Sequence, residues 1–313
     1  MRVLVTGGAG FIGSNIAQHL SQAGHDVVAT DSFASATWKN LADFTGDVLT
    51  LRSRDDLDSI RKLGPYDAIF HQASITGVID TTTGASLSET DLQQPMLLNN
   101  VEFFRGLLDH AVDTGARVVW ASSCSVYGRG PVPMKESQTP DPLNSYAFSK
   151  LSMERMAQRY APKLAHPIVA LRYSNVYGPG EGHKGKLASM IHQLAVGMRA
   201  GKRPRIFTDG SQKRDFVYID DVVAANVKAL DCPETGAFNV GAGQSWSFNE
   251  LVATLNDILG TDLAPDYFDN PYGFTQDWTQ CNLEKSNAVL GYEPKFDLAA
   301  GVKAYAESGQ LGE

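Results

Sequence analysis

Tyr146 and Lys150 stand four residues apart in the stretch YAFSK. In a helix this spacing places both side chains on one face. A neighbouring ammonium favours the phenolate form of tyrosine, so we expect Lys150 to lower the pKa of Tyr146. A phenol with a lowered pKa can exchange a proton with a substrate hydroxyl. By itself the pair also fits two exposed helix residues, so its chemistry depends on what surrounds it.

A glycine-rich turn begins the chain, in VLVTGGAGFIGS. Glycines let the backbone turn tightly and approach a pyrophosphate, which then faces the N-terminus of the following helix. The turn follows a β-branched run and precedes a helical pattern, which is the context that a dinucleotide site requires. The expected cofactor contacts in this turn are Gly7, Gly10, Phe11, Ile12 and Gly13.

The residues that follow the second predicted strand bear on the choice between NAD and NADP. Asp31 at the strand end, with Ser32 beside it, would bind the adenosine ribose diol and favours NAD. Lys39 and Arg54 could instead receive the 2′-phosphate of NADP, although both fit solvated surface charges equally well. The sequence therefore predicts tightly bound NAD or NADP, with a preference for NAD.

The composition of the whole chain argues against several other classes of protein. The 313 residues carry a formal net charge of -8 and no run of Lys or Arg, which disfavours nucleic acid or an anionic membrane as partner. Cys124, Cys232 and Cys281 are far apart and fit neither a zinc site nor a disulfide framework. The apolar N-terminus is interrupted by glycines, and no membrane span follows. We expect a cytoplasmic protein without a metal site.

Short β-branched runs alternate with helical patterns over the first half of the chain. This alternation predicts an α/β fold, a Rossmann-type doubly wound parallel sheet with helices on both faces. The predicted strands are Arg2–Thr6, Asp26–Thr30, Val48–Arg52, Ala68–Gln72, Arg117–Ser122 and Ile168–Tyr173. The predicted helices are Phe11–Ala23, Leu57–Leu63, Asn99–Thr114 and Ser145–Tyr160.

After Gly178 the alternation breaks, and a smaller mixed α/β lobe is expected at the carboxyl edge of the sheet, where open sheets bind ligands. We divide the chain into a dinucleotide-binding domain, residues 1–178, and a mainly substrate-binding lobe, residues 179–313. Residues 214–243 could return to the first domain. The elements expected here are helices Leu187–Arg199, Asp220–Leu230 and Asn249–Leu259, and strands Arg214–Val217 and Ala237–Val240.

Motifs along essentially the whole chain resemble the extended short-chain dehydrogenase/reductase family, whose NAD-dependent epimerases and dehydratases modify nucleotide sugars. The matching stretches are TGGAGFIGS, HQAS, ASSCSVYG, YAFSK, RYSNVYGPG, KRDFVYIDDV and FNVGAG. The resemblance implies that Ser123 and Tyr146 bind the reacting sugar oxygen and that Lys150 orders Tyr146 and the cofactor. It also implies cofactor contacts at Ala73, Ser74 and Asn99, a nucleotide-diphosphate sugar as substrate, and a homo-oligomer.

The chemistry expected of such a site is transient oxidation. A carbinol C–H is not acidic, so its centre is inverted by moving hydride to the nicotinamide and returning it to the other face of the carbonyl. The 4,6-dehydratases of the family carry an Asp-Glu pair where this sequence has Cys124 and Ser125, which argues against dehydration. Reductases of the GDP-fucose synthase type use a cysteine and a histidine, so Cys124 keeps that alternative open.

The stretch EGHKGK and the stretch NPYGFTQ near the C-terminus together resemble the corresponding stretches of the ADP-glyceromanno-heptose 6-epimerases. In that group the lysine at the position of Lys184 is a second acid/base that works opposite Tyr146. A UDP-hexose 4-epimerase would share Ser123, Tyr146 and Lys150 without requiring Lys184. We interpret His183 as a neighbour that orients the loop.

The resemblance also implies a set of substrate contacts. These are Asn175, Lys186, Phe207, Ser211, Arg214 and Tyr272. The sequence departs from the heptose epimerases at Lys186, where they have serine, and at Gln193, where they have histidine. The loop from Ile75 to Leu92 is longer than theirs. These departures bear on the identity of the substrate and leave the hydride chemistry unchanged.

Overall fold

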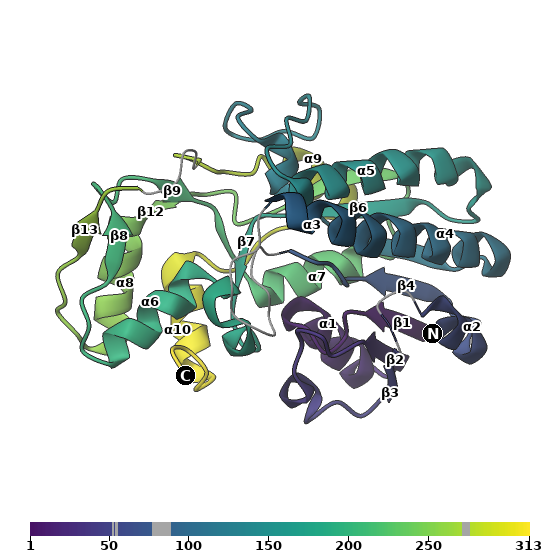
Figure 1. The fold of residues 1–313 in the computed structure, drawn as a ribbon, viewed down its shortest axis with the longest axis horizontal. Helices are drawn as coiled ribbons and strands as arrows, with labels where there is room; N and C mark the ends of the chain where they lie inside the picture. The colour runs from purple at the N-terminus through teal and green to yellow at the C-terminus, as the bar shows by residue number, and fades with distance from the viewer. Residues whose placement is uncertain (52, 54–55, 77–88, 271–275) are drawn as a thin grey trace.

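A seven-stranded parallel sheet forms the centre of the protein (Figure 1). The computed structural model describes residues 1–51, 53, 56–76, 89–270 and 276–313. The strand order is β3-β2-β1-β4-β5-β6-β11, the doubly wound order of dinucleotide-binding folds with one further strand. The strands are β1 (Arg2–Thr6), β2 (Asp26–Asp31), β3 (Asp47–Thr50), β4 (Ala68–His71), β5 (Arg117–Ser123), β6 (Ile168–Tyr173) and β11 (Gly236–Val240).

Helices cover both faces of this sheet because its strands are apolar on both sides. Val3 and Val5 pack against one layer and Leu4 against the other, since successive strand side chains point to opposite faces. The first layer holds α1 (Phe11–Gln22) and α7 (Ile219–Ala229). The second layer holds α2 (Leu57–Leu63), α4 (Phe103–Thr114) and α5 (Ser145–Tyr160).

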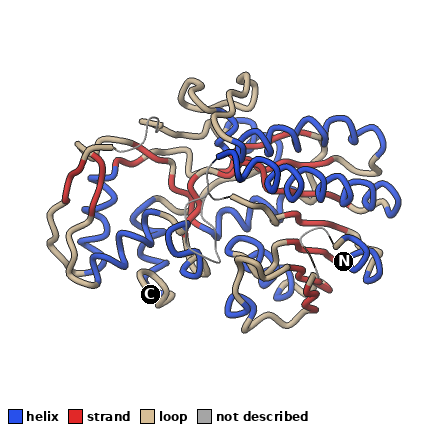
Figure 2. The backbone as a smooth tube through the Cα atoms, in the orientation of Figure 1, coloured by secondary structure: helices blue, strands red, loops and turns tan. Residues whose placement is uncertain are grey.

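A smaller lobe lies beyond the carboxyl edge of the sheet, at the left in Figure 2. Its strands form short pairs rather than one sheet. They are β7 (Asn175–Tyr177) with β10 (Phe216–Tyr218), β8 (Arg205–Phe207) with β13 (Asp266–Phe268), and β9 (Lys213–Arg214) with β12 (Trp246–Ser247). The helices after β6, apart from α7, are α6 (Met190–Arg199), α8 (Phe248–Leu259), α9 (Glu284–Leu290) and α10 (Leu298–Glu307).

The predicted Rossmann-type architecture is confirmed; most predicted element ends agree within two residues, and three elements differ by more. The predicted strand Arg214–Val217 is two strands separated at Asp215, whose carboxylate accepts the N–H groups of Ala242 and Cys281. The helix predicted from Asn99 is preceded by α3 (Glu89–Met96) and opens as a π-helix, Leu97–Glu102. The helix predicted from Leu187 begins at Met190.

Residues 214–243 contribute to the central sheet. β11 pairs in parallel with β6, and α7 packs beside α1. These contacts support a return of this segment to the dinucleotide-binding domain, which we keep as a proposal together with the boundary at residue 178. In the part of the chain that the structure describes, no helix has the length and apolar character needed to cross a membrane.

Candidate active site

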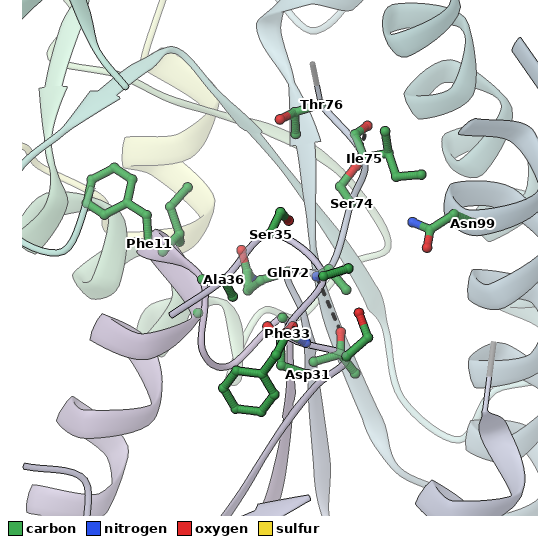
Figure 3. Close-up of a pocket in the computed structure, with 18 of the residues that line it drawn as sticks. Phe11, Asp31, Phe33, Ser35, Ala36, Gln72, Ser74, Ile75, Thr76 and Asn99 are labelled. Atoms are coloured by element: carbon green, nitrogen blue, oxygen red, sulfur yellow. Dashed lines mark hydrogen bonds between the residues drawn. The ribbon is translucent and has the colours of Figure 1, made fainter. Parts of the chain in front are cut away.

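A cavity of about 860 Å³ lies at the carboxyl ends of β1, β2 and β4. Figure 3 shows Phe11 on one side of it and Asn99 on the other, with Asp31 below and Ser74 to Thr76 above. Ten of the residues expected to bind the cofactor line this cavity. They are Gly7, Gly10, Phe11, Ile12, Gly13, Asp31, Ser32, Ala73, Ser74 and Asn99.

The glycine turn leaves no room for side chains where a dinucleotide would pass. Gly7 has φ +68°, in the left-handed region, and a Cβ there would lie 2.7 Å from the backbone N of Ala73. A Cβ on Gly13 would collide with the carbonyl group of Gly7. The N-terminus of α1 therefore opens directly into the cavity. The bare backbone and the helix end fit a pyrophosphate.

Asp31 ends β2 at the floor of the same cavity. Its carboxylate accepts the backbone N–H of Ala9 at 3.2 Å and that of Phe33 at 2.9 Å, while burial raises its pKa. Lys39 is exposed on a short helix and is not among the described residues that line the cavity. Arg54 lies outside the described residues. A contact between Lys39 and the 2′-phosphate of NADP stays a prediction.

Tyr146 and Lys150 lie in the first two turns of α5, and Ser123 ends the neighbouring strand β5. The Lys150 ammonium lies 5.7 Å from the Tyr146 ring centroid and donates to the Ala121 carbonyl at 2.7 Å. A hydrogen bond between Tyr146 and Ser123 favours the phenolate, against a larger desolvation cost. The structure thus brings Ser123, Tyr146 and Lys150 together.

The expected direction of the Tyr146 pKa shift is wrong. Burial raises the pKa of Tyr146 to about 12, and burial lowers the pKa of Lys150 to about 7. Both shifts have the same cause, because desolvation disfavours the charged form of each side chain. The lysine therefore does not activate the phenol by charge alone, and both neutral forms are favoured between these two values.

A buried ion pair lies next to Lys150. Arg172 of β6 binds the Glu154 carboxylate with two hydrogen bonds, of 2.9 and 2.7 Å. The Ser122 hydroxyl donates to the same carboxylate at 2.6 Å. Glu154 lies one turn beyond Lys150 on α5 and raises the pKa of Lys150 against the larger effect of burial. The pair therefore helps to keep the buried ammonium charged.

A second cavity, of about 170 Å³, lies between β7 and α6. Three of the residues predicted for substrate or second acid/base roles line it, namely Asn175, Lys184 and Arg214. Lys184 also lines the cofactor cavity and so forms part of the wall between the two. Its ammonium lies 5.4 Å from the ring centroid of Phe11, and burial lowers its pKa. A buried lysine with a lowered pKa gives up its proton more readily than an exposed one, so Lys184 is a candidate acid/base group.

The other predicted substrate contacts lie elsewhere. Lys186 lines the cofactor cavity rather than the second one. Phe207 packs edge-on against Phe268, and the Ser211 N–H donates to the Asp209 carboxylate; neither residue lines a described cavity. Tyr272 and most of the long loop between Ile75 and Leu92 lie outside the described residues.

Gln193 and His192 are neighbours on α6 and make different contacts. The Gln193 amide donates to the carbonyl groups of Lys186 and Ala188, so it holds the segment that carries Lys184. His192 is buried, and its Nδ1 lies 2.9 Å from the Tyr305 hydroxyl. The neighbouring histidine is therefore a core residue and does not replace the histidine of the heptose epimerases.

Cys124 faces the core. Its thiol donates to the Arg172 carbonyl at 3.3 Å and lies 3.3 Å from the Cys281 thiol, and both cysteines are buried. Like Ser123, Tyr146 and Lys150, Cys124 lines neither described cavity, but its thiol is engaged by the Arg172 carbonyl and Cys281. This placement disfavours the alternative in which Cys124 takes part in epimerisation, as in enzymes of the GDP-fucose synthase type.

Sequence reasoning missed several residues of the site. Asn40 bonds the glycine turn and the segment before Lys184, and Phe248 forms part of the second cavity. The wall next to Asp31 continues through residues 33–36. The stretch from 33 to 36 could have been found from its position directly after β2, whereas no local spacing points to Asn40 or Phe248.

The sequence profile of the NAD dependent epimerase/dehydratase family matches residues 3–241. The chain belongs to that family. This result confirms the expected enzyme class, an epimerase-type enzyme that depends on a nicotinamide cofactor, and the resemblance on which that expectation rested.

Similar proteins include epimerases of two kinds. The chain is 36% identical to an ADP-L-glycero-D-manno-heptose-6-epimerase of Brachyspira hyodysenteriae, over 97% of this chain and 96% of the relative. The crystal structure of the Helicobacter pylori enzyme of the same name superposes with a TM-score of 0.87 at 38% identity, covering 98% and 95% of the two chains. UDP-glucose 4-epimerase from Thermotoga maritima, solved with UDP-glucose, gives a TM-score of 0.89 at 29% identity and 99% coverage of both chains.

Proposed function

We propose that the protein is a redox-neutral nucleotide-sugar epimerase that inverts C6 of an ADP-glycero-manno-heptose. The observation that carries this proposal is the position of Lys184 between the two cavities. When a carbon outside the sugar ring is inverted, the oxygen on that carbon faces one direction before the inversion and another direction after it. An acid/base group on each side is therefore useful. Tyr146 is one such group, and Lys184 lies in a separate segment of the chain.

The chain's own residues handle the protons. When bound, a nicotinamide cofactor supplies the acceptor and the donor of hydride for one carbon of the sugar. Tyr146, hydrogen-bonded to Ser123, exchanges the proton of the C6 hydroxyl in one orientation of the substrate. After the C6 carbonyl has turned over, Lys184 exchanges the proton of the same oxygen in the other orientation. Which of the two residues acts first depends on the epimer that enters.

The second cavity supports recognition of a diphosphate next to the reacting sugar. Arg214 lines the cavity, and its guanidinium carbon lies 5.8 Å from the Phe248 ring centroid. A guanidinium group can bind two phosphate oxygens at once. Asn175, at the start of β7, lines the same cavity and offers an amide for a further polar contact. We assign the nucleotide diphosphate to this region.

We further propose that the cofactor is NAD. Asp31 accepts two backbone N–H groups at the end of β2, and its remaining lone pairs suit a ribose diol. A 2′-phosphate there would meet a carboxylate, and Lys39 is exposed away from the cavity. Binding of NAD and NADP to the cofactor-free protein, measured by calorimetry, tests this preference, and tighter binding of NADP would contradict it.

The second candidate is a UDP-hexose 4-epimerase, favoured by the backbone similarity to the Thermotoga maritima enzyme. Lys184→Met decides between the two. We expect a loss of turnover with ADP-glycero-manno-heptose of about 10²-fold or more, because the second proton carrier is gone. The assay follows the stereochemistry of ADP-heptose and UDP-glucose by NMR. Lys202→Met, at an exposed position just after α6 that lines neither described cavity, is the control. Native turnover of UDP-glucose by Lys184→Met would support the 4-epimerase.

A cytoplasmic location and a homo-oligomeric state are further predictions from the sequence and the family resemblance. The first agrees with the three free cysteines. Light scattering of the purified protein measures the second.

A further inference from the structure

One irregular segment forms a wall of the cofactor cavity. Residues 178–189, here called the strap, connect β7 to α6. His183, Lys184 and the next three residues of the strap line the cavity together with Phe11 of the glycine turn. By chain connectivity the strap leads into the second lobe, yet it lies over the dinucleotide site. Hydrogen bonds from the dinucleotide domain hold the strap in this position.

Asn40 joins the strap to the glycine turn. Its amide nitrogen donates to the Ala9 carbonyl at 3.1 Å and to the Gly180 carbonyl at 3.0 Å. The backbone carbonyl of Asn40 accepts a hydrogen bond from the Gln18 side-chain amide at 2.7 Å, which fixes Asn40 against α1. The side chain that precedes it, Lys39, is exposed. Asn40 therefore bonds the glycine turn and the strap at once.

Asn15 makes a second, independent connection from α1. Its amide donates to the Pro179 carbonyl at 3.0 Å and to the Phe11 carbonyl at 2.8 Å. Within the strap, the Nδ1 of His183 lies 2.9 Å from the Gly180 carbonyl. This nitrogen must carry the proton if it is to donate a hydrogen bond to that carbonyl. Two asparagines of the dinucleotide domain thus hold adjacent carbonyl groups of the strap.

Further hydrogen bonds keep the strap in shape and tie it to the second lobe. Within the strap, Glu181 is fully buried and accepts the N–H groups of Gly178 and Ser189, at 3.1 and 2.6 Å, and the Ser189 hydroxyl. Toward the second lobe, the Gly180 N–H donates to the Gln310 side chain at 2.8 Å, and the Gln193 amide of α6 donates to the carbonyl groups of Lys186 and Ala188. The strap can therefore stay attached to the second lobe while it leaves the cavity. The bonds of Asn15 and Asn40 are the ones that such a movement breaks.

We propose that Asn15 and Asn40 are positioning residues that clasp the strap over the dinucleotide, so that the cofactor stays bound between turnovers and Lys184 stays between the two cavities. A redox-neutral enzyme regenerates its cofactor in each turnover and gains from slow release. The part of this inference about cofactor retention rests on the cofactor dependence of the family and is independent of the sugar that the enzyme uses. The part about Lys184 rests on the proposed function.

The test measures the rates at which NADH binds and leaves. Stopped-flow fluorescence gives the association rate with cofactor-free protein and the dissociation rate by displacement with excess NAD. The variants are Asn40→Ala, Asn15→Ala and the double variant, and no sugar is added. Asn287→Ala is the control, because that asparagine bonds Glu293 near the end of α9, away from the cavity. A melting curve of each protein confirms the native fold.

An unclasped strap obstructs cofactor movement less in both directions. Because one neutral hydrogen bond changes an equilibrium constant by about 2- to 10-fold, we expect each single variant to raise both rates by a factor in this range, and the double variant to raise them further. A rise in the dissociation rate alone would mean that the substitution damaged the glycine turn, and it would overturn the proposal. Native rates in both single variants would also overturn it.

Discussion

Lys150, which is buried, and Lys184, which is partly buried, are two lysines of the proposed active site that are held in different ways. Burial lowers the pKa of both, and each ammonium lies near an aromatic ring, 5.7 Å from Tyr146 and 5.4 Å from Phe11. Lys150 sits inside the regular helix α5 and donates to a strand carbonyl. Lys184 sits in a short 3₁₀ helix of the strap, whose position depends on side chains from both lobes.

This difference separates the hydride chemistry, which the family shares, from the proposed selection of the substrate by Lys184. A helix on a parallel sheet holds Lys150 beside Tyr146 whatever the second lobe contains. Lys184 depends on where the second lobe places the strap. The shared hydride chemistry thus lies on the central sheet and its helices, while the proposed choice of sugar carbon depends on the strap, which side chains from two lobes hold in place.

The largest effect on turnover should come from a substitution in α5, at Tyr146. Tyr146→Phe removes the proton carrier and should lower turnover by about 10²- to 10⁴-fold, while cofactor binding is retained. NMR of the sugar product measures the turnover.

The matched control for this variant is Tyr160→Phe at the end of the same helix, where the hydroxyl donates to Asp109 near the surface. Its turnover should stay within about twofold of native, as is usual for surface substitutions. Equal losses in both variants would show that the helix, rather than the phenol, had been damaged.

The buried ion pair next to Lys150 provides an intermediate test. Glu154 raises the pKa of Lys150, which burial lowers to about 7, so Glu154→Gln should lower that pKa further, by about one unit. The ammonium is present below its pKa and lost above it. The alkaline limb of the pH–kcat profile should therefore move to lower pH.

The variant Glu154→Gln leaves Arg172 buried without its anion, so a control must remove both charges. The double variant Glu154→Gln with Arg172→Met should show a smaller shift and a more stable fold, because no uncompensated buried cation is left. If the single variant retains the native pH profile, Glu154 has no electrostatic influence on Lys150.

The smallest effect should come from the far end of the strap. Gln193→Ala removes two hydrogen bonds to the carbonyl groups of Lys186 and Ala188. We expect kcat to fall by about 2- to 10-fold with KM for the sugar nucleotide little changed, because Lys184, the proposed proton carrier, is still present but less well placed. Gln193→His, the residue of the heptose epimerases, should restore part of kcat if this side chain also holds the strap. A rise in KM with unchanged kcat would contradict this role.

Much of the fold and the cofactor site was predictable from local patterns. The strand at Arg2–Thr6, the glycine turn after it and Asp31 follow one another in the order that a dinucleotide site needs, and each lies where expected. The pair Tyr146 and Lys150 was predictable because helical spacing decides which residues share a face. The pKa of Tyr146 was not, because its direction depends on how much water the folded protein removes from the phenol.

The sequence by itself determined the doubly wound sheet, the dinucleotide turn and the redox pair, since periodicity and short spacings decide these features within single elements. The tertiary structure decided that Lys39 is exposed, that Cys124 faces the core, that Lys184 separates two cavities and that Asn40 reaches Gly180, which is 140 residues away in the chain. Such contacts join irregular segments whose mutual position arises from the packing of two lobes. No local pattern encodes that position, because it is set by the sum of many long-range contacts.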